Sequence, residues 1–448
     1  MMRTLAWMTL LVLPAAGQTP AFRSLWDSPE VVRRIQSGIE ENRKGWATLR
    51  FVDTQGKPVT GVHAEIEQTS HAFLFGANLF MLGGFDSQAE NRLWEERFLG
   101  LFNYATTPFY WPTLEPKQGA LRFAADSPKI YRRPPPDLAV DFARRHGLTL
   151  KGHPLVYDQF FPLGLPEWVP RDPNEIDRLV RIRMEQIAAR YRDSIRVWDV
   201  FNEVLSRPGR VEVPMPFDML FRSHQNAARL FPPDTKLSIN EGDNRVWTEP
   251  QVETSHIYLL LQNLRLRGAR VDAIGFQCHL WGDSAARMLR GEQFRPVEML
   301  RNLDRYADFH LPVHITEVTI PTSSASAEGE AEQALLARSL YRLWFSHPAV
   351  EAITWWNLAD GTAFGDENKH LAGLVHKDLS PKLSYQTLRK LIREEWHTKT
   401  EINSAGASEI RFQGFYGRYR AVVRYKGQVK TVEFPVAKGA LNVVEVKL

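Results

Sequence analysis

Cysteine is nearly absent from this sequence, because Cys278 is the only one among 448 residues. A single thiol can form no internal disulfide bond and supplies no cysteine cluster for a metal ion. No predicted helix pairs a histidine with a carboxylate at the i, i+4 spacing of a metal site, and no Gly-x-Ser-x-Gly segment occurs. These absences disfavour a metal-dependent hydrolase and a serine hydrolase, and we expect neither a metal nor an organic cofactor.

Dense positive charge and long apolar runs are also missing. The 56 Lys and Arg residues nearly balance 52 Asp and Glu, so no nucleic-acid partner is expected. No apolar segment is long enough to span a bilayer. Arg3, the apolar stretch 5–13 and the small residues 15–17 instead predict a signal peptide over 1–17, and hence a secreted or periplasmic protein.

From residue 73 onward, β-forming segments alternate with helical ones. This rhythm predicts an α/β fold, a (β/α)₈ barrel over 73–398 with long loops. A doubly wound open sheet is the alternative, but no Gly-rich phosphate turn follows the first strand. The eight strands are expected at 73–79, 102–106, 148–156, 195–201, 236–240, 273–279, 313–318 and 352–357.

The two ends of the chain have a different pattern. Residues 24–44 have helical spacing, and alternating segments at 46–52 and 62–66 predict a β-hairpin. After residue 399 the helical pattern stops, and four short alternating strands are expected at 410–412, 417–423, 430–434 and 441–446. Because four short strands make a small core, we expect 399–448 to pack with the hairpin of segment 18–72 in one β-module.

Polar residues that could perform chemistry collect where the predicted strands end. In a parallel barrel these ends meet at one face. Glu203 and Glu317 end two apolar strands, where a lone buried carboxylate would be costly. Two carboxylates at one face are the arrangement that cleavage of a glycosidic bond requires. The full set at the strand ends is His153, Asn202, Glu203, Asn240, Glu241, Gln277, His279, Glu317, Trp356 and Asp360.

The neighbouring Cys278 and His279 resemble a thiol dyad only in sequence. Successive strand residues point to opposite faces, so Gln277 and His279 share one face and Cys278 points into the layer between barrel and helices. Free cysteine is commonly buried and inert. We therefore expect Cys278 to be a core residue and His279 to face the site.

Six short motifs follow one another, one per predicted strand. They are GHPLVY at 152–157, WDVFNE at 198–203, KLSINE at 236–241, IGFQCH at 274–279, ITE at 315–317 and ITWWNLAD at 353–360. Together, and in this order from about residue 73 to 396, they resemble the motifs of glycoside hydrolase family 10, the xylanase family. The segments at both ends, including GFYGRY at 414–419, resemble its plant-like branch.

The resemblance implies a retaining β-glycosidase. Glu203 would be the general acid/base and Glu317 the nucleophile, with environments that push their pKa values apart. Asn202 would hydrogen-bond the substrate's 2-hydroxyl, and His279 would orient Glu317. The resemblance makes Glu241 and Asp243, which also follow a strand, supporting residues outside the catalytic set. The residues that would shape the sugar site are His153, Gln277 and Trp356.

The second strand departs from the family. Many members carry a polar run there whose Glu, Asn and Lys grip the sugar two places from the cleavage point, but this chain has Phe109, Tyr110 and Trp111. Stacking therefore replaces hydrogen bonding, or the site is partly closed. Tyr157 stands where many members have Trp, and Thr319 where many have Asp. We add Trp111 and Tyr157 to the predicted substrate-binding residues.

The leading interpretation is a monomeric enzyme that cleaves β-1,4 bonds of xylan or a related plant-type polysaccharide. Another β-linked glycan or a small β-glycoside remains an alternative, because the departures concern the substrate. A non-catalytic carbohydrate-binding barrel would keep Trp111, Trp281 and Trp356 but would not need both glutamates. A structural or adhesion protein would depend on 400–448, which concentrates neither aromatic nor charged residues.

Overall fold

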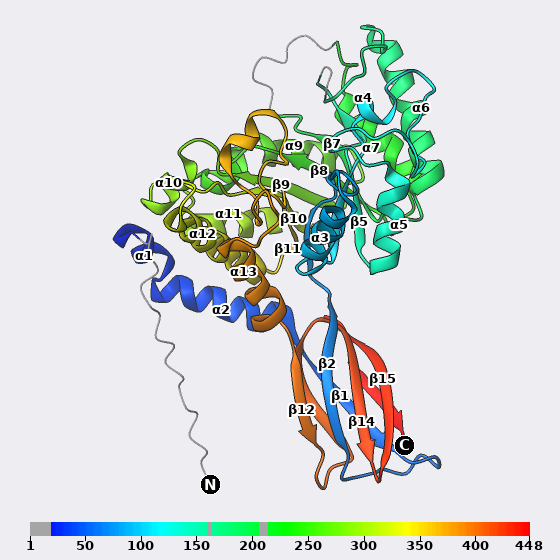
Figure 1. Ribbon diagram of the computed structural model, residues 1–448, viewed down its shortest axis with the longest axis vertical. Coiled ribbons are helices and arrows are strands. Elements are labelled where there is room, and N and C mark those ends of the chain that lie inside the picture. The colour runs from blue at the N-terminus through cyan, green and yellow to red at the C-terminus, as the bar shows by residue number, and fades with distance from the viewer. Residues whose placement is uncertain (1–18, 160–162, 206–213) are drawn as a thin grey trace.

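The computed structural model describes residues 19–159, 163–205 and 214–448, so the predicted signal peptide at 1–17 lies outside the described residues. Eight parallel strands form a closed barrel, in which β5 also pairs with β7, and the predicted barrel is confirmed (Figure 1). The two-residue β6 (Val156–Tyr157) pairs beside β7. The barrel strands are β3 (Leu74–Asn78), β4 (Tyr104–Pro108), β5 (Thr149–His153), β7 (Val197–Asn202), β8 (Lys236–Glu241), β9 (Ala273–His279), β10 (Val313–Thr319) and β11 (Val350–Trp355).

Helices surround this barrel, and their ends follow from local sequence. Ser87 and Glu90 form a reciprocal capping box at the start of α3. Asp172 caps α6 by accepting from two backbone N–H groups, and Gly147, at φ 65°, ends α5. The longer helices are α3 (Gln88–Leu99), α5 (Pro136–His146), α6 (Pro173–Tyr191), α7 (Met219–Leu230), α9 (His256–Leu266), α11 (Pro296–Ala307), α12 (Ala327–Ser346) and α13 (Leu383–Lys390).

Short helical segments lie in the connections. They are α4 (Trp111–Leu114), α8 (Arg245–Thr248), α10 (Ser284–Leu289), two 3₁₀ turns at Val252–Thr254 and Gly365–His370, and a π-helical turn at Leu391–Glu395. On the outer side of the strands, the Trp198 indole packs with Phe109 and Phe231 and against the backbone of Gly152, where a Cβ atom would lie 2.2 Å from the ring. Glycine at this position thus lets β5 and β7 approach and places His153 at the end of β5.

The predicted helix at 24–44 is two helices, α1 (Pro20–Trp26) and α2 (Pro29–Arg43). Pro29 restricts the preceding Ser28, whose backbone has ψ 139° and cannot continue a helix. α2 packs along α12. At its end the buried Arg43 donates to the carbonyl oxygens of Phe345, His347 and Val350, which ties α2 to the barrel.

The remaining strands form a β-sandwich below the barrel in Figure 1. One sheet has the order β13-β1-β16 and the other β12-β2-β14-β15, so strands from both ends of the chain pair in each sheet. A separate hydrophobic core fills the space between the two sheets. The strands are β1 (Lys44–Val52), β2 (His63–His71), β12 (Lys399–Asn403), β13 (Glu409–Phe415), β14 (Gly417–Tyr425), β15 (Gln428–Val436) and β16 (Val443–Lys447).

The predicted N-terminal hairpin is wrong, because β1 and β2 lie in different sheets. β1 pairs with β13 and β16, whereas β2 pairs with β12 and β14. Leu49 of β1 and Ile66 of β2 are both buried in the core between the sheets. Residues 53–62 cross from one sheet to the other, so the alternation that suggested a hairpin instead reflects two strands that face one core.

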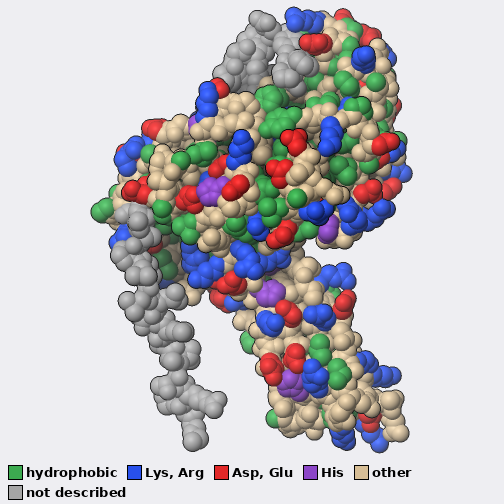
Figure 2. Space-filling view, viewed as in Figure 1, with side chains coloured by type: hydrophobic (Ala, Val, Ile, Leu, Met, Phe, Trp, Pro, Cys, Tyr) green, Lys and Arg blue, Asp and Glu red, His purple; other side chains and the backbone are tan. Residues whose placement is uncertain are grey.

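The surface agrees with the balanced composition. Lys, Arg, Asp and Glu side chains are interspersed over the visible face of the barrel (Figure 2). Among the residues that the structure describes, no helix is both long and apolar enough to cross a membrane.

Candidate active site

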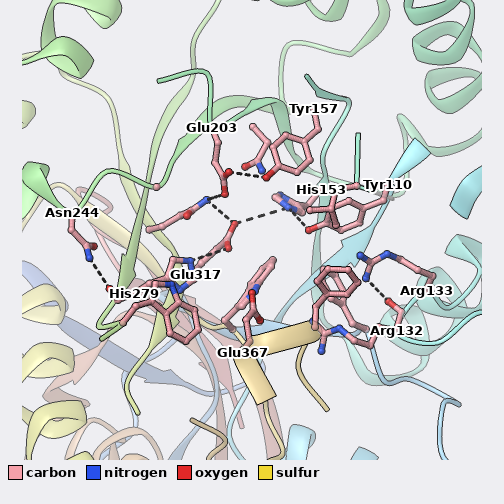
Figure 3. A pocket seen from close by; sticks show the side chains of 18 residues that line it. Tyr110, Arg132, Arg133, His153, Tyr157, Glu203, Asn244, His279, Glu317 and Glu367 are labelled. Atoms are coloured by element: carbon pink, nitrogen blue, oxygen red, sulfur yellow. Dashed lines mark hydrogen bonds and ion pairs between the residues drawn. The ribbon is translucent and has the colours of Figure 1, made fainter. Parts of the chain in front are cut away.

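A cavity of about 290 Å³ opens at the carboxyl ends of the barrel strands. It brings together eight of the nine predicted site residues and leaves out Trp111 (Figure 3). Further lining side chains come from the loops that follow the strands. The eight are His153, Tyr157, Asn202, Glu203, Gln277, His279, Glu317 and Trp356.

Gln277 connects the two glutamates. Its Nε2 lies 3.2 Å from Oε1 of Glu203 and 3.1 Å from Oε1 of Glu317, so these two carboxylate oxygens are at most about 6.3 Å apart. Glu203 follows β7 with a left-handed backbone, φ 53°, and its N–H donates to the carbonyl of Asn240 at 2.7 Å. The next residue after Gln277, Cys278, is fully buried in the layer outside the barrel, as predicted.

Glu317 is buried, with 4% of its surface exposed, and hydrogen-bond donors replace the water it has lost. Besides Gln277, the Nδ2 of Asn240 donates to its Oε1 at 2.8 Å, and the Nε2 of His279 lies 3.3 Å from its Oε2. The other ring nitrogen of His279 lies 2.8 Å from the Thr319 hydroxyl. His279 therefore touches Glu317 as the resemblance implied, and Thr319 fixes its ring.

Asn240 is a functional residue that the predicted set omits, although it appears among the strand-end residues. Its Nδ2 donates both to Glu317 and, at 2.8 Å, to the Oδ1 of Asn202. The Thr316 hydroxyl in turn donates to its Oδ1. One amide thus aligns the predicted nucleophile with the side chain expected to bind the 2-hydroxyl. The position of Asn240 at the end of a strand was the sequence feature that could have identified it as a site residue.

His153 belongs to a buried chain of charges that runs into the barrel. Its Nδ1 lies 2.8 Å from Oδ2 of Asp199, which also accepts from Lys151 at 2.7 Å. Burial alone would raise the pKa of Asp199, but Lys151 and the His153 hydrogen bond outweigh burial and lower it. The Nε2 of His153 faces the cavity, 3.1 Å from the Tyr110 hydroxyl and 4.0 Å from Oε1 of Glu317.

Two other contacts surround Glu203. The Tyr157 hydroxyl donates to its Oε2 at 2.7 Å, and Gln159 donates to the same hydroxyl. Behind it, the carboxylate of Glu241 accepts from the backbone N–H groups of Val204 and Leu205 at 2.8 and 3.2 Å. Burial raises the pKa of Glu241 to about 8, although these hydrogen bonds oppose the rise. Glu241 therefore supports the loop after Glu203 and does not line the cavity.

The prediction that Trp111 binds substrate is wrong, because its side chain lies in the hydrophobic core. Its Nε1 donates to Glu115 at 2.8 Å, and its ring packs edge-on against Trp168 and under the guanidinium of Arg183. The chain leaves β4 and turns into α4 here, so that Tyr110 faces the cavity and Trp111 faces inward. Of the three aromatic residues at 109–111, Tyr110 is the one that lines the cavity.

Sequence reasoning also missed Arg132, Arg133, Asn244 and Glu367, which line the cavity. Arg132, Arg133 and Asn244 lie in loops, and Glu367 lies in the 3₁₀ turn at Gly365–His370. None belongs to a recognisable motif, and charged side chains in such segments are usually solvated. The Asn244 Nδ2 donates to the backbone carbonyl of His279 at 2.6 Å, which joins two of the loops. Only the length of the connection after β4 could have drawn attention to the two arginines.

Fold and site together define a (β/α)₈ barrel with two bridged glutamates at the carboxyl ends of its strands, an architecture of glycoside hydrolases. Glycosyl hydrolase family 10 matches residues 110–391, and this chain belongs to that family.

The chain is 28% identical over 402 residues to the anti-sigma-I factor RsgI6 of Acetivibrio thermocellus, covering 88% of this chain and 46% of that protein. It is 26% identical over 385 residues to the endo-1,4-beta-xylanase 5 of Arabidopsis thaliana, covering 81% of this chain and 58% of the relative. It therefore spans about half the length of these two relatives. The crystal structure of xylanase 10B from Thermotoga maritima aligns with a TM-score of 0.58 at 22% identity, over 72% of this chain and 96% of that one, and shows the shared fold.

Proposed function

We infer that this protein is a retaining glycoside hydrolase that cleaves β-1,4 bonds of xylan or a related plant-type polysaccharide. The observation that carries this inference is the Gln277 bridge, which limits the two bridged oxygens of Glu203 and Glu317 to a separation of at most about 6.3 Å. Retaining enzymes keep their carboxyl groups about 5–5.5 Å apart, whereas inverting enzymes leave about 6.5–9.5 Å for a water molecule.

In the first step, Glu317 attacks the anomeric carbon and forms a glycosyl–enzyme ester while the bond to the leaving oxygen breaks. Glu203 gives its proton to that oxygen, so the departing sugar leaves as a neutral alcohol. In the second step, Glu203 takes a proton from water, and the hydroxide oxygen displaces Glu317 from the anomeric carbon. Two inversions restore the β configuration and return both glutamates to their starting states.

The surroundings of the two carboxylates support these roles. Glu317 is buried among donors from Asn240, Gln277 and His279, which suits a group that must carry charge before it attacks. Glu203 is more exposed and contacts the Tyr157 hydroxyl, which suits a group that gains and loses a proton.

Family membership and the names of the relatives support xylan as the leading substrate. The endo-1,4-beta-xylanase B of Thermotoga neapolitana is 24% identical to this chain, and a xylanase 10B from Thermotoga petrophila has been crystallised with xylobiose. The segment after β4 differs from that of many family members, so the side-chain substituents that the glycan carries are not assigned by the family alone. Export through a signal peptide at 1–17 is proposed with it.

Product analysis on xylan, glucuronoxylan, arabinoxylan, mannan and β-glucan tests the proposal. We expect xylo-oligosaccharides as the products. On xylan, the activity of Glu203→Gln and of Glu317→Gln should each fall by at least about 10⁴-fold. Asp243→Asn is the matched control, because Asp243 also follows a strand but pairs with Arg245 outside the cavity. Cleavage that survives Glu317→Gln would contradict the nucleophile assignment, and binding without cleavage of any polymer would favour the carbohydrate-binding barrel.

Stereochemistry separates the two roles. With an activated β-glycoside and added azide, Glu317→Gly should release the α-glycosyl azide, because azide then attacks from the face that the carboxylate occupied. Glu203→Gly should release the β-glycosyl azide, because the covalent intermediate still forms and azide replaces water. Proton NMR of the products distinguishes the two anomers, and the same anomer from both variants would contradict the double displacement.

A further inference from the structure

Two adjacent arginines form the side of the cavity that faces away from Asn244 and His279 (Figure 3). Arg132 and Arg133 come from the loop between α4 and α5, and only 3% and 6% of their surfaces are exposed. Together with Tyr110 they form what we call the arginine wall. Charged residues are rarely buried to this degree unless a partner of opposite charge accompanies them.

The loop holds both guanidinium groups in fixed positions. The Nη1 of Arg132 donates to Oδ1 of Asn357 at 2.7 Å and to the carbonyl of Thr362. The guanidinium of Arg133 lies 4.0 Å over the ring of Tyr110, and its Nη1 donates to the carbonyl of Arg132 at 2.9 Å. The wall is thus organised before any ligand binds.

Arg122 braces the same loop from behind. Its guanidinium donates to the backbone carbonyls of Thr113, Pro128 and Arg133. A planar group with several donors suits this task, because it joins three separate turns of the loop. These contacts hold the loop in the conformation in which the side chains of Arg132 and Arg133 line the cavity.

Among the described residues, the two arginines of the wall form no ion pair with a carboxylate. In the part of the chain that the structure describes, no carboxylate lies within 4.0 Å of the nitrogens of Arg132 or Arg133, and the Nε of each is buried without a hydrogen-bond partner. Burial lowers the pKa of both arginines, and the charge of Glu367 in the cavity lining opposes this shift. Glu367 also accepts a hydrogen bond from Asn357, whose Oδ1 accepts from Arg132. Burial lowers the pKa of Arg132 to about 10, which leaves it charged at neutral pH.

We propose that the arginine wall binds a carboxylate carried by the substrate, so that this enzyme acts on a β-glycan with uronic acid groups, a glucuronic-acid-substituted xylan in particular. The proposal rests on the function inferred above. Guanidinium groups bind carboxylates through charge-assisted hydrogen bonds, and a sugar acid supplies a carboxylate.

The position of the wall fits this ligand. Tyr110 separates Arg133 from His153, and His153 reaches to 4.0 Å from Glu317, so the wall stands beyond the sugar that reacts. An acidic group there binds without entering the space between the two glutamates. Its negative charge also stays away from Glu203 and Glu317, where a third carboxylate would be repelled.

Calorimetric titration of the inactive Glu317→Gln protein tests the proposal with a matched pair of ligands. One ligand is a xylo-oligosaccharide bearing glucuronic acid, and the other is the same oligosaccharide after its carboxyl group has been reduced to the neutral alcohol. We expect the acidic ligand to bind about 10- to 100-fold more tightly. Adding Arg133→Met should remove most of that preference, whereas Arg133→Lys, which keeps the charge without the planar fork, should keep part of it.

Arg144→Met provides the charge-matched control, because Arg144 is an exposed residue of α5 and its loss changes the net charge equally. It should leave the preference intact. Unchanged binding of the neutral ligand by the Arg133 variants shows that the site is still folded. The proposal would be overturned if the two ligands bound with equal affinity or if neither bound. It would also be overturned if Arg133→Met and Arg133→Lys weakened the binding of the acidic and the neutral ligand equally. Hydrolysis by the wild-type protein is measured separately, so that failure of the proposed function is recognised by itself.

Discussion

The two sides of the cavity are built in different ways. On one side, side chains from β8, β9 and β10 form a hydrogen-bonded network, and we call this side the glutamate wall. Its members are Asn240, Gln277, His279 and Glu317. On the other side, the arginine wall comes from a single long loop and from the exit of β4.

This difference separates chemistry from recognition. Strand ends in a closed barrel hold side chains at fixed spacing, so they can align two carboxylates with a bond that breaks. A loop can change its length and its side chains without moving those carboxylates. We therefore expect changes in the glutamate wall to alter the rate for every substrate, and changes in the arginine wall to alter the choice of substrate.

Asp199→Asn should have the largest effect, because it removes the support behind His153 and leaves the buried Lys151 without its counter-charge. We expect a loss of about 3–5 kcal/mol in the free energy of unfolding near neutral pH. The pKa of Asp199 is lowered in the folded protein, so its stabilisation is present above the unfolded value near 4 and is lost as the pH falls through the folded value. Urea unfolding at pH 7 and at about pH 2, well below the unfolded value, measures both effects.

Asp234→Asn is the control for this prediction, since Asp234 pairs with Arg196 on the surface, where 68% of its side chain is exposed. Removing such a pair should cost less than about 1 kcal/mol. Equal losses in the two variants would contradict the importance of the buried chain.

Glu241→Gln should change how stability depends on pH. Because burial raises the folded pKa of Glu241 to about 8, the folded protein holds a proton that the unfolded chain releases above about pH 4.5. The wild type should therefore lose stability as the pH rises from about 5 to 8, by about 3 kcal/mol, and the variant should lack this slope. Thermal unfolding at several pH values measures it, and parallel curves would refute a protonated Glu241.

Trp111→Phe and Tyr110→Phe change two adjacent residues, of which one lies in the core and the other lines the cavity. The first should mainly affect stability and the second mainly activity. Trp111→Phe removes a buried hydrogen bond to Glu115 and part of the packing against Arg183, so we expect a loss of about 1–3 kcal/mol in stability with an unchanged KM. Tyr110→Phe removes the hydrogen bond to His153 and should lower kcat/KM about fivefold with little loss of stability. The reverse pattern would show that Trp111 contacts substrate.

Tyr157→Phe should have the smallest effect, a shift in the pH–rate profile. The hydroxyl of Tyr157 donates to Glu203 and so favours its deprotonated form. Without that bond, the alkaline limb of kcat/KM should move to higher pH. An unmoved limb would indicate that the hydrogen bond has no influence on the acid/base step.

The barrel and the glutamate wall could be predicted because their sequence signals are local. Each strand is a short apolar segment between helical ones, and Glu203, Gln277, His279 and Glu317 each stand where such a segment ends. Closing the barrel then brings these positions to one face, so their proximity follows from the fold class alone. The alternation of side chains along β9 likewise placed Cys278 outside the barrel.

The remaining features depend on distant contacts that no local pattern contains. Trp111 and Tyr110 are neighbours of similar character, and only the turn from β4 into α4 decides which one faces the cavity. Arg132 and Arg133 have the composition of a solvated loop until Arg122 and Tyr110 fix them. The strands β1 and β2 alternate as a hairpin would, but the partners that assign them to separate sheets come from residues 399–448.

The sandwich has a consequence for how this protein is made. Glu65 of β2 accepts a hydrogen bond from Arg424 of β14, which lies 359 positions later in the chain. Similarly, β1 pairs with β13 and β16, which are also near the end of the chain. The ribosome therefore releases β1 and β2 long before their partners exist, and both strands present open edges during most of synthesis. The sandwich can close only after the barrel segment has emerged, so an unpaired β1 or β2 marks a chain that is still unfinished.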